Sequence, residues 1–161
     1  MTIRIEPYTP SHLDAVVQLS LRAWAPVFDS LKQVFEPEVY KVFYPEGWSA
    51  SQRQAVEAVC AADDTHVWVA LDNASPVGFV AVKLHDADKM GEIYMVAVDP
   101  AHQGRGIASE LIALALDWMK AAGMAIAMVE TGGDPGHAPA RQTYEKIGFG
   151  LFPVARYFKK L

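Results

Sequence analysis

The sequence is poor in cysteine, with Cys60 as the single thiol among 161 residues. A disulfide framework within the chain is therefore excluded, and this cysteine usage fits a reducing compartment such as the cytoplasm. We interpret Cys60 as a packing residue, because it lies in the apolar helical stretch AVEAVCAA. The five histidines also lack the spacing typical of zinc ligands, so the sequence predicts no metal site.

Positive charge is scarce as well. The 14 Lys and Arg residues face 19 Asp and Glu residues, which gives a net charge of -5 at pH 7. A protein that binds nucleic acid needs a basic face, so this class of partner is disfavoured. No window of about 18 apolar residues occurs, and Arg4 and Glu6 interrupt any apolar run at the start. We therefore expect a cytoplasmic protein with no membrane span and no signal peptide.

What the chain does contain is enough apolar sequence for a core. The hydrophobic fraction is 52% and the charged fraction is 20%, which is typical of compact globular proteins. The length of 161 residues predicts a single domain that spans 1–161.

The order of the hydrophobic patterns predicts a mixed α/β fold. Alternating or continuous apolar runs predict strands at 2–7, 66–71, 77–84, 92–98 and 124–131, and two short strands around Pro153. Helical spacing predicts a first helix capped by Ser11 or Thr9, and further helices from Ser49 to Ala62, over 107–122 and over 138–147, with two short helices between 25 and 48. We expect Pro26 to end or bend the first helix.

The most specific feature is the junction VDPAHQGRGIASELI, where a strand ends at Val98 and a helix begins after two glycines. Gly104 and Gly106 would let a phosphate approach backbone amides at the helix N-terminus, and Ser109 and Arg105 could add a hydroxyl and a charge. The Walker loop needs a Gly-Lys-Ser/Thr end, and the dinucleotide fingerprint needs a glycine where Ser109 stands, so neither motif fits. A plain tight connection between strand and helix remains the alternative.

Two motifs resemble the GNAT superfamily of acetyl-CoA-dependent N-acetyltransferases. Gln103, Gly106 and Ala108 form the pattern Gln-x-x-Gly-x-Ala, which resembles motif A of that family. The segment ARQTYEKIGF resembles motif B, in which a tyrosine, here Tyr144, is followed four residues later by Gly-Phe. The preceding strand EIYMVAVDP resembles the family's fourth strand, and the resemblance covers residues 66 to 161.

The resemblance implies the GNAT fold. This is an α/β (α+β) fold with a mixed, mostly antiparallel sheet of about seven strands, flanked by about four to five helices and splayed between strands four and five. It also implies acetyl-CoA as cosubstrate, with no metal. The implied cofactor contacts are Val96, Ala97, Val98, Gln103, Gly104, Arg105, Gly106, Ile107, Ala108, Ser109 and His137. His137 stands where the family commonly has an asparagine, so it could contact the cofactor, transfer a proton or only fill the loop.

Acetyl transfer to an amine needs a base for the amine, a donor for the developing negative oxygen and an acid for the leaving thiolate. The resemblance implies Tyr144 as the acid, with simple packing as the alternative, and a backbone N–H of the fourth strand as the donor. It implies Glu92 as the base, unless this is a solvated strand-end carboxylate, with Glu130 as the rival. By alternation, we expect the Glu92 side chain to share a face with Tyr94 and Val96.

The predicted function is therefore transfer of the acetyl group of acetyl-CoA to a primary amine of a small molecule or peptide, by direct attack. The alternatives are a GNAT-like module that binds acyl-CoA in a regulatory role, and a nucleotide- or phosphate-binding α/β domain. Trp24, Phe28 and Tyr157 belong to an aromatic-rich set that the resemblance places beside the amine. The same aromatic residues could instead form core or the face of a homodimer.

Overall fold

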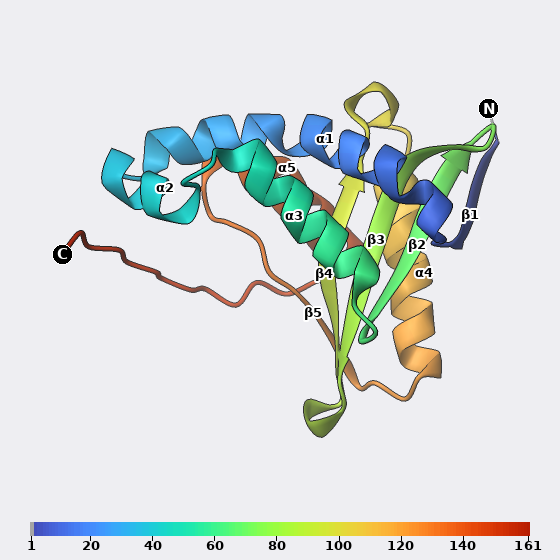
Figure 1. The fold of residues 1–161 in the computed structure, drawn as a ribbon. Helices are drawn as coiled ribbons and strands as arrows, with labels where there is room; N and C mark the ends of the chain where they lie inside the picture. Colours follow the sequence, from blue (N-terminus) through green and yellow to red (C-terminus); the bar gives the residue numbers. More distant parts are fainter. Residues whose placement is uncertain (1) are drawn as a thin grey trace. The chain divides into compact units, whose positions relative to one another are not determined.

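The computed structural model of the protein describes residues 2–161, which form five strands, five α-helices and four short 3₁₀ helices (Figure 1). The strands are β1 (Ile3–Pro7), β2 (Thr65–Asp72), β3 (Ser75–His85), β4 (Met90–Val98) and β5 (Ile126–Val129). The α-helices are α1 (Leu13–Val34), α2 (Pro37–Phe43), α3 (Trp48–Ala61), α4 (Ile107–Ala121) and α5 (Ala138–Ile147). The 3₁₀ helices are η1 (Pro10–His12), η2 (Asp86–Asp88), η3 (Pro100–His102) and η4 (Pro135–His137).

By their internal contacts these elements form two compact units. The first unit contains the chain up to Ala23 and Gln52–Glu130, and so carries all five strands and α4. The second unit contains Trp24–Ser51 and Thr131–Leu161, and so carries α2, α5 and the final segment. A single domain over 1–161 stays a prediction. Within residues 2–161, no helix combines the length and apolarity needed to cross a membrane.

The first unit is built on a sheet with the strand order β1-β2-β3-β4-β5. The pairs from β1 to β4 are antiparallel, and β5 lies parallel to β4, so the predicted mixed, mostly antiparallel sheet is confirmed. The number of strands in the described chain is five, not seven.

The two strands expected around Pro153 account for the difference. Residues 149–161 have no regular secondary structure, and the side chains of Leu151, Phe152 and Tyr157 are exposed. A strand needs a partner for its backbone N–H and C=O groups, and an apolar composition alone does not supply one. The prediction of strands there was therefore wrong.

The pairing of β4 with β5 is short. It covers four residues on each strand, from Met90 with Ile126 to Ile93 with Val129. The rest of β4 extends past the end of β5. The splay expected between strands four and five stays a prediction. The strand predicted over 124–131 is shorter than expected, and it lies at an edge of the five-stranded sheet.

A β-bulge interrupts β4. The pairing of β3 with β4 shifts between Ala81 and Val82, which leaves Tyr94 as an extra residue on β4. Side chains alternate along a strand, so one inserted residue moves those after it to the other face. Val96 therefore lies on the opposite face from Glu92, and the expectation that they share a face was wrong.

Helix α4 covers one face of this sheet. A Cβ added to Gly91 would collide with the Met119 side chain, and one added to Gly78 would lie 3.2 Å from Leu111 Cδ1. These glycines allow β3 and β4 to approach the helix closely. The buried core between them includes Val80, Val82, Ile93, Ile107, Leu111, Ile112, Ala115 and Met119.

Helix α1 runs through Pro26, where the sequence predicted an end or a bend. A proline inside a helix removes one hydrogen bond and crowds the preceding turn. Burial continues on one face, because Val17 and Phe28 are eleven residues apart, about three helical turns, and both are buried. The buried positions on both sides of the proline favour a continuous helix over the break predicted from Pro26 alone.

Candidate active site

The loop between β4 and α4 forms an open turn at the helix N-terminus. Gly104 and Gly106 have φ angles of 75° and 82°, in the left-handed region that favours glycine. A Cβ built on either glycine would meet no atom within 4 Å, so the space around the turn is open. The N–H of Glu110 donates to the Gly106 carbonyl at 3.0 Å. The amides of residues 107–109 precede this bond and have no acceptor within the helix, which suits them to bind an anion.

Polar side chains hold this turn in shape. The Gln103 amide Nε2 donates to the carbonyl of Val98 at 3.0 Å. The buried Asp99 carboxylate accepts from the amide of Ala101 at 3.0 Å and from Arg22 Nε at 3.0 Å. Burial by itself raises the pKa of Asp99, but the hydrogen bonds from Arg22 and Ala101 outweigh it and lower the pKa below its usual value. The start of the turn is thereby tied to β4 and to α1.

The cofactor contacts predicted on this unit lie close together along the chain. The turn holds the seven consecutive residues Gln103, Gly104, Arg105, Gly106, Ile107, Ala108 and Ser109. The other three, Val96, Ala97 and Val98, lie on the part of β4 that extends past β5. The open strand edge therefore leads directly into the open turn.

Glu92 lies near the start of β4, and its side chain is 18% exposed. Its Oε1 is 2.8 Å from Nε2 of His85, the last residue of β3. Sequence reasoning placed His85 in a loop and missed this pair. The only signal was that both residues flank the turn between two predicted strands. The rival carboxylate, Glu130, follows the end of β5 and is exposed.

Tyr144 lies on α5 in the second unit, and its position is fixed by the end of that helix. Gly148 has a φ of 111°, and the amide of Phe149 donates to the Tyr144 carbonyl at 3.0 Å. This is the Schellman arrangement, and it brings the two rings edge to face with centroids 6.0 Å apart. The spacing of tyrosine and Gly-Phe therefore has a structural cause. Burial raises the pKa of Tyr144 to about 12.

The loop before α5 is held together by hydrogen bonds. His137 Nδ1 is paired with the Asp134 carboxylate, which also accepts from Ser30 Oγ at 2.8 Å. Burial by itself raises the pKa of Asp134, but the hydrogen bonds from His137 and Ser30 outweigh it and lower the pKa. Arg141 donates to the carbonyls of Gly132 and Asp134 at 2.6 and 2.8 Å. The predicted contact of His137 with the cofactor stays a prediction, and its Nδ1 is engaged within the loop.

The predicted substrate residues differ in exposure. Phe28 is buried, stacked on Trp48 at 4.8 Å and edge-on to Tyr44 at 5.2 Å, whereas Tyr157 is 90% exposed and Trp24 is half-buried. The second unit also has a hollow of about 410 Å³. It is lined by Pro26, Asp29, Ser30, Gln33, Val34, Pro135 and Gly136, and by none of the three predicted residues.

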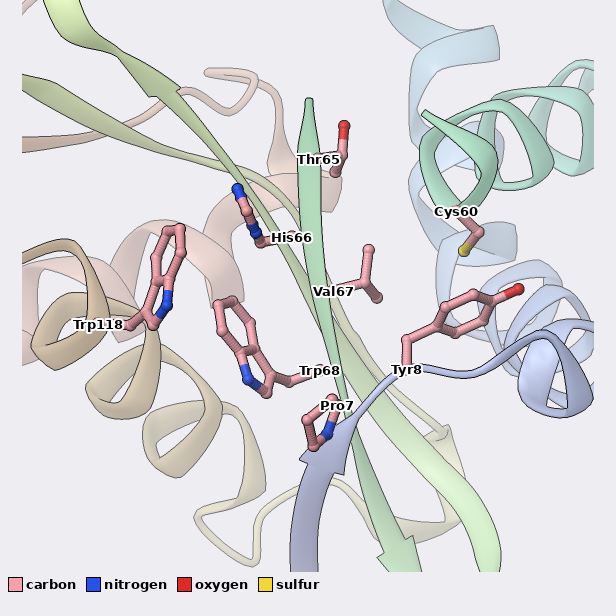
Figure 2. Close-up of a pocket in the computed structure, with 8 residues that line it drawn as sticks. All are labelled: Pro7, Tyr8, Cys60, Thr65, His66, Val67, Trp68 and Trp118. Atoms are coloured by element: carbon pink, nitrogen blue, oxygen red, sulfur yellow. The ribbon is translucent and has the colours of Figure 1, made fainter. Parts of the chain in front are cut away.

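Another hollow of about 410 Å³ lies at the edge of β2 in the first unit. Figure 2 shows His66, Trp68 and Trp118 on one side of the strand, and Tyr8 and Cys60 on the other. Trp118 comes eleven residues after the start of α4, about 17 Å along the axis at 1.5 Å per residue, so this hollow is distinct from the turn.

Cys60 lines the same hollow. The Cys60 thiol is half-buried and hydrogen-bonded to the Tyr8 side chain. Burial raises the pKa of this thiol, which disfavours the reactive thiolate.

Among residues 2–161, no group of three His, Cys, Asp or Glu side chains is arranged to hold a metal ion.

Comparisons with known proteins agree with this geometry. The model of the acetyltransferase (GNAT) family matches residues 28–149. The mycothiol acetyltransferase of Gordonia bronchialis is 38% identical over 119 residues, which are 70% of this chain and 37% of that protein. The mycothiol acetyltransferase of Rhodococcus opacus is 30% identical over 83% of this chain and 46% of its own length. The chain thus spans less than half the length of these relatives.

The fold is also similar to solved structures. The PaiA N-acetyltransferase of Thermoplasma acidophilum, solved in complex with coenzyme A, superposes with a TM-score of 0.71 and 15% identity, over 96% of this chain and 94% of that one. At this level of identity the likeness concerns the fold.

Proposed function

The chain belongs to the acetyltransferase (GNAT) family, and from that membership we propose that it transfers the acetyl group of acetyl-CoA to a primary amine of a small molecule or peptide. The observation that carries the proposal is the open turn at the N-terminus of α4, where two glycines have positive φ and the amides of residues 107–109 have no helical acceptors. Such a turn suits the diphosphate of coenzyme A, because amides and helix dipole both favour negative charge.

The open edge of β4 supports the same assignment. We assign the diphosphate to the turn from Gln103 to Ser109 and the pantetheine arm to the backbone of residues 96–98. A strand edge without a partner offers N–H and C=O groups to an amide-containing chain, as it would to a peptide. The bound cosubstrate supplies an activated acyl group as a thioester, and the residues of this chain supply position and proton transfers.

Three groups of the chain have proposed roles in the transfer. Glu92 accepts the proton of the attacking amine, directly or through water. A backbone N–H of β4 donates to the thioester oxygen as negative charge develops. Tyr144 gives its phenolic proton to the departing thiolate, and its raised pKa of about 12 keeps the phenol protonated at neutral pH. Each transfer leaves Glu92 with one proton more and Tyr144 with one proton fewer, so exchange with water deprotonates the carboxyl group and reprotonates the phenolate before the next turnover.

The acceptor is proposed only as a class. One family relative is named for mycothiol, and an N-acetyltransferase of similar fold from Acinetobacter haemolyticus is named for aminoglycosides, with a TM-score of 0.69 and 17% identity over 98% of both chains. These names support small, polar amines as the first compounds to test.

Binding and turnover test the proposal separately. Acetyl-CoA at about 100 times its Kd should stabilise the protein by about 2.7 kcal/mol in a thermal melt, whereas ATP and NAD should leave the melting temperature unchanged. A panel of primary amines should then release free coenzyme A thiol, with mass spectrometry identifying the acetylated product. Stabilisation without turnover on any amine would favour a binding module, and stabilisation by ATP or NAD instead would contradict the cofactor assignment.

A further inference from the structure

We propose that His85 is a positioning residue for the catalytic carboxylate: its imidazole holds one oxygen of Glu92 and leaves the other free to take the amine proton. The inference rests on the proposed function, because it takes Glu92 as the base. It goes further by giving a role to a residue that neither the sequence motifs nor the comparisons single out. The contact that carries it is the 2.8 Å distance between His85 Nε2 and Glu92 Oε1.

The strand pairing places both side chains on one face of the sheet. Gly91 faces α4, because a Cβ there would collide with Met119, so its neighbour Glu92 points to the opposite face. Lys83 is the direct partner of Glu92 across the strands, and His85 follows Lys83 by two residues. Residues paired across strands share a face, and residues two apart on a strand share it too.

The charge on Lys83 is directed elsewhere. Its Nζ lies 4.0 Å from the centroid of the Tyr94 ring, in the geometry of a cation–π contact. Tyr94 is the extra residue of the bulge, so the bulge provides the ring that holds Lys83. Glu92 is thereby left with the imidazole as its hydrogen-bonded partner. A lysine paired with Glu92 would instead stabilise the ionised carboxylate and so make it a weaker base.

The turn that carries His85 and Glu92 is anchored to the sheet. His85 pairs with Met90 in the last step of the β3–β4 ladder. Lys89 has a φ of 51°, and its carbonyl accepts from the amides of Ala125 and Ile126 at 2.7 and 3.2 Å. The hairpin end is therefore fixed to the start of β5.

The exposure of the two side chains fits these roles, in which His85 holds the carboxylate and Glu92 acts as the base. The Glu92 side chain is 18% exposed and that of His85 is 40% exposed. A half-buried carboxylate with one oxygen bonded loses rotational freedom, and its second oxygen keeps a fixed direction. A carboxylate accepts and does not donate, so Nε2 carries the proton in this pair and the imidazole acts as donor. The ionisable neighbours along the same hairpin are Lys83, Asp86, Asp88, Lys89 and Tyr94, and Glu130 follows the adjoining strand β5.

A double-mutant cycle on the enzyme tests the proposal, with kcat and KM measured for the best amine. Glu92→Gln should lower kcat by about 10²-fold or more, the usual size for loss of a general base. His85→Phe keeps a ring but no donor, and should lower kcat about tenfold through misplacement of the base, with KM for acetyl-CoA unchanged. His85→Gln restores an N–H donor at similar reach and should return kcat to within about threefold of the wild type.

The decisive result is the double variant. If His85 acts only through Glu92, adding His85→Phe to Glu92→Gln should produce no further loss of kcat. Equal losses in both backgrounds would overturn the positioning role, and so would failure of His85→Gln to restore kcat. His66→Phe is the matched control, because the His66 ring lies against the Trp118 ring of α4, with centroids 4.4 Å apart, on the face of the sheet opposite Glu92, and the variant should keep wild-type kcat.

The outcomes also distinguish this proposal from the proposed acetyl-transfer function on which it rests. Wild-type kcat in Glu92→Gln would overturn the role of His85 but leave acetyl transfer standing. No turnover by the wild type on any amine would overturn both. Side-chain ¹H–¹⁵N NMR gives a readout apart from activity: the Nε2–H proton of His85 should show the downfield shift of a hydrogen bond to a carboxylate in the wild type and lose that shift in Glu92→Leu. An unchanged Nε2–H shift would contradict the pair itself.

Discussion

At the scale of single residues, the proposed chemistry depends on which groups hold a proton. Burial raises the pKa of Tyr144 to about 12, and the helix end at Gly148 fixes its ring against Phe149. A phenol held in this way is protonated at neutral pH and cannot act as a base there. Tyr144 therefore fits the role of proton donor to the thiolate.

Replacing Tyr144 with phenylalanine tests that role. The change removes the phenolic proton and keeps the ring, so acetyl-CoA affinity should stay the same and kcat should fall about 10²-fold. Steady-state kinetics and calorimetry give the two quantities. Tyr8→Phe is the control, because Tyr8 lies in the β2-edge hollow, and it should keep wild-type kcat. Wild-type kcat in Tyr144→Phe would remove this residue from the mechanism.

The pH dependence gives a second check on Tyr144. An acid must be protonated to act, and a pKa of about 12 means that deprotonation begins well above the ordinary phenol value of about 10. The wild-type kcat should therefore show no loss from this group through pH 10. An alkaline limb centred near 10, present in the wild type and absent from Tyr144→Phe, would contradict the raised pKa.

At the scale of elements, α4 has a glycine with positive φ at each end. Gly106 caps its N-terminus with a φ of 82°, and Gly123 follows its C-terminus with a φ of 86°. At the C-terminus the amide of Met124 donates to the Met119 carbonyl at 3.1 Å, which is the Schellman arrangement. At both positions a residue with a side chain would be strained by the left-handed backbone, but only Gly106 belongs to the proposed diphosphate site.

This symmetry gives a matched pair of variants. Gly106→Ala and Gly123→Ala should each destabilise the fold by about 1–2 kcal/mol, the cost of a left-handed L-residue, measured by urea unfolding. Gly106→Ala should also weaken acetyl-CoA binding in calorimetry, because a methyl group would enter the open turn. Gly123→Ala should bind as the wild type does. Equal binding by both variants would count against the turn as the diphosphate site.

At the scale of the whole molecule, a link between distant parts of the sequence supports the turn. Arg22 on α1 and Asp99 after β4 are 77 positions apart, and Arg22 Nε donates to the carboxylate at 3.0 Å. The Asp99 side chain is 12% exposed, so without Arg22 its charge would be buried and poorly paired. The N-terminal helix therefore stabilises the loop that leads into the proposed site.

Removal of Arg22 should lower the free energy of unfolding and make that free energy less dependent on pH. Arg22→Leu should cost about 1–3 kcal/mol at pH 7, as expected when a buried acceptor loses its partner. The folded-state pKa of Asp99 is lowered, so the pair contributes fully above the unfolded value of about 3.9 and loses its contribution as pH falls through the folded pKa. Urea unfolding at pH 7 and pH 3 should therefore show a smaller gap between wild type and variant at the lower pH.

A surface ion pair is the control for this prediction. Arg4 Nε lies 3.2 Å from Glu6 Oε2, with side chains 68% and 35% exposed. Such pairs contribute about 1 kcal/mol or less, so Arg4→Leu should change stability little at either pH. A loss in Arg22→Leu no greater than in Arg4→Leu would show that Asp99 does not need its partner.

The sequence by itself determined the order of the main elements and the position of the open turn. Local signals were sufficient, because alternation marks strands, helical spacing marks helices, and the glycines at 104, 106 and 123 mark turns that other residues adopt only with strain. The helix over 107–122 and that over 138–147 match α4 and α5 to within one residue at each end. The spacing of Tyr144 and Gly148 is equally local, since one helix end contains both.

The tertiary structure alone decided what depends on partners far along the chain. Pro26 lies inside α1, 149–161 has no strand partner in the described chain, and the bulge at Tyr94 reverses the faces of β4. Burial along one face keeps α1 continuous through Pro26. Strand pairing decides the other two features, and a single strand's pattern does not contain its partner's register. For the same reason only the folded hairpin places His85 beside Glu92, because two ends of neighbouring strands meet there and no local motif records it.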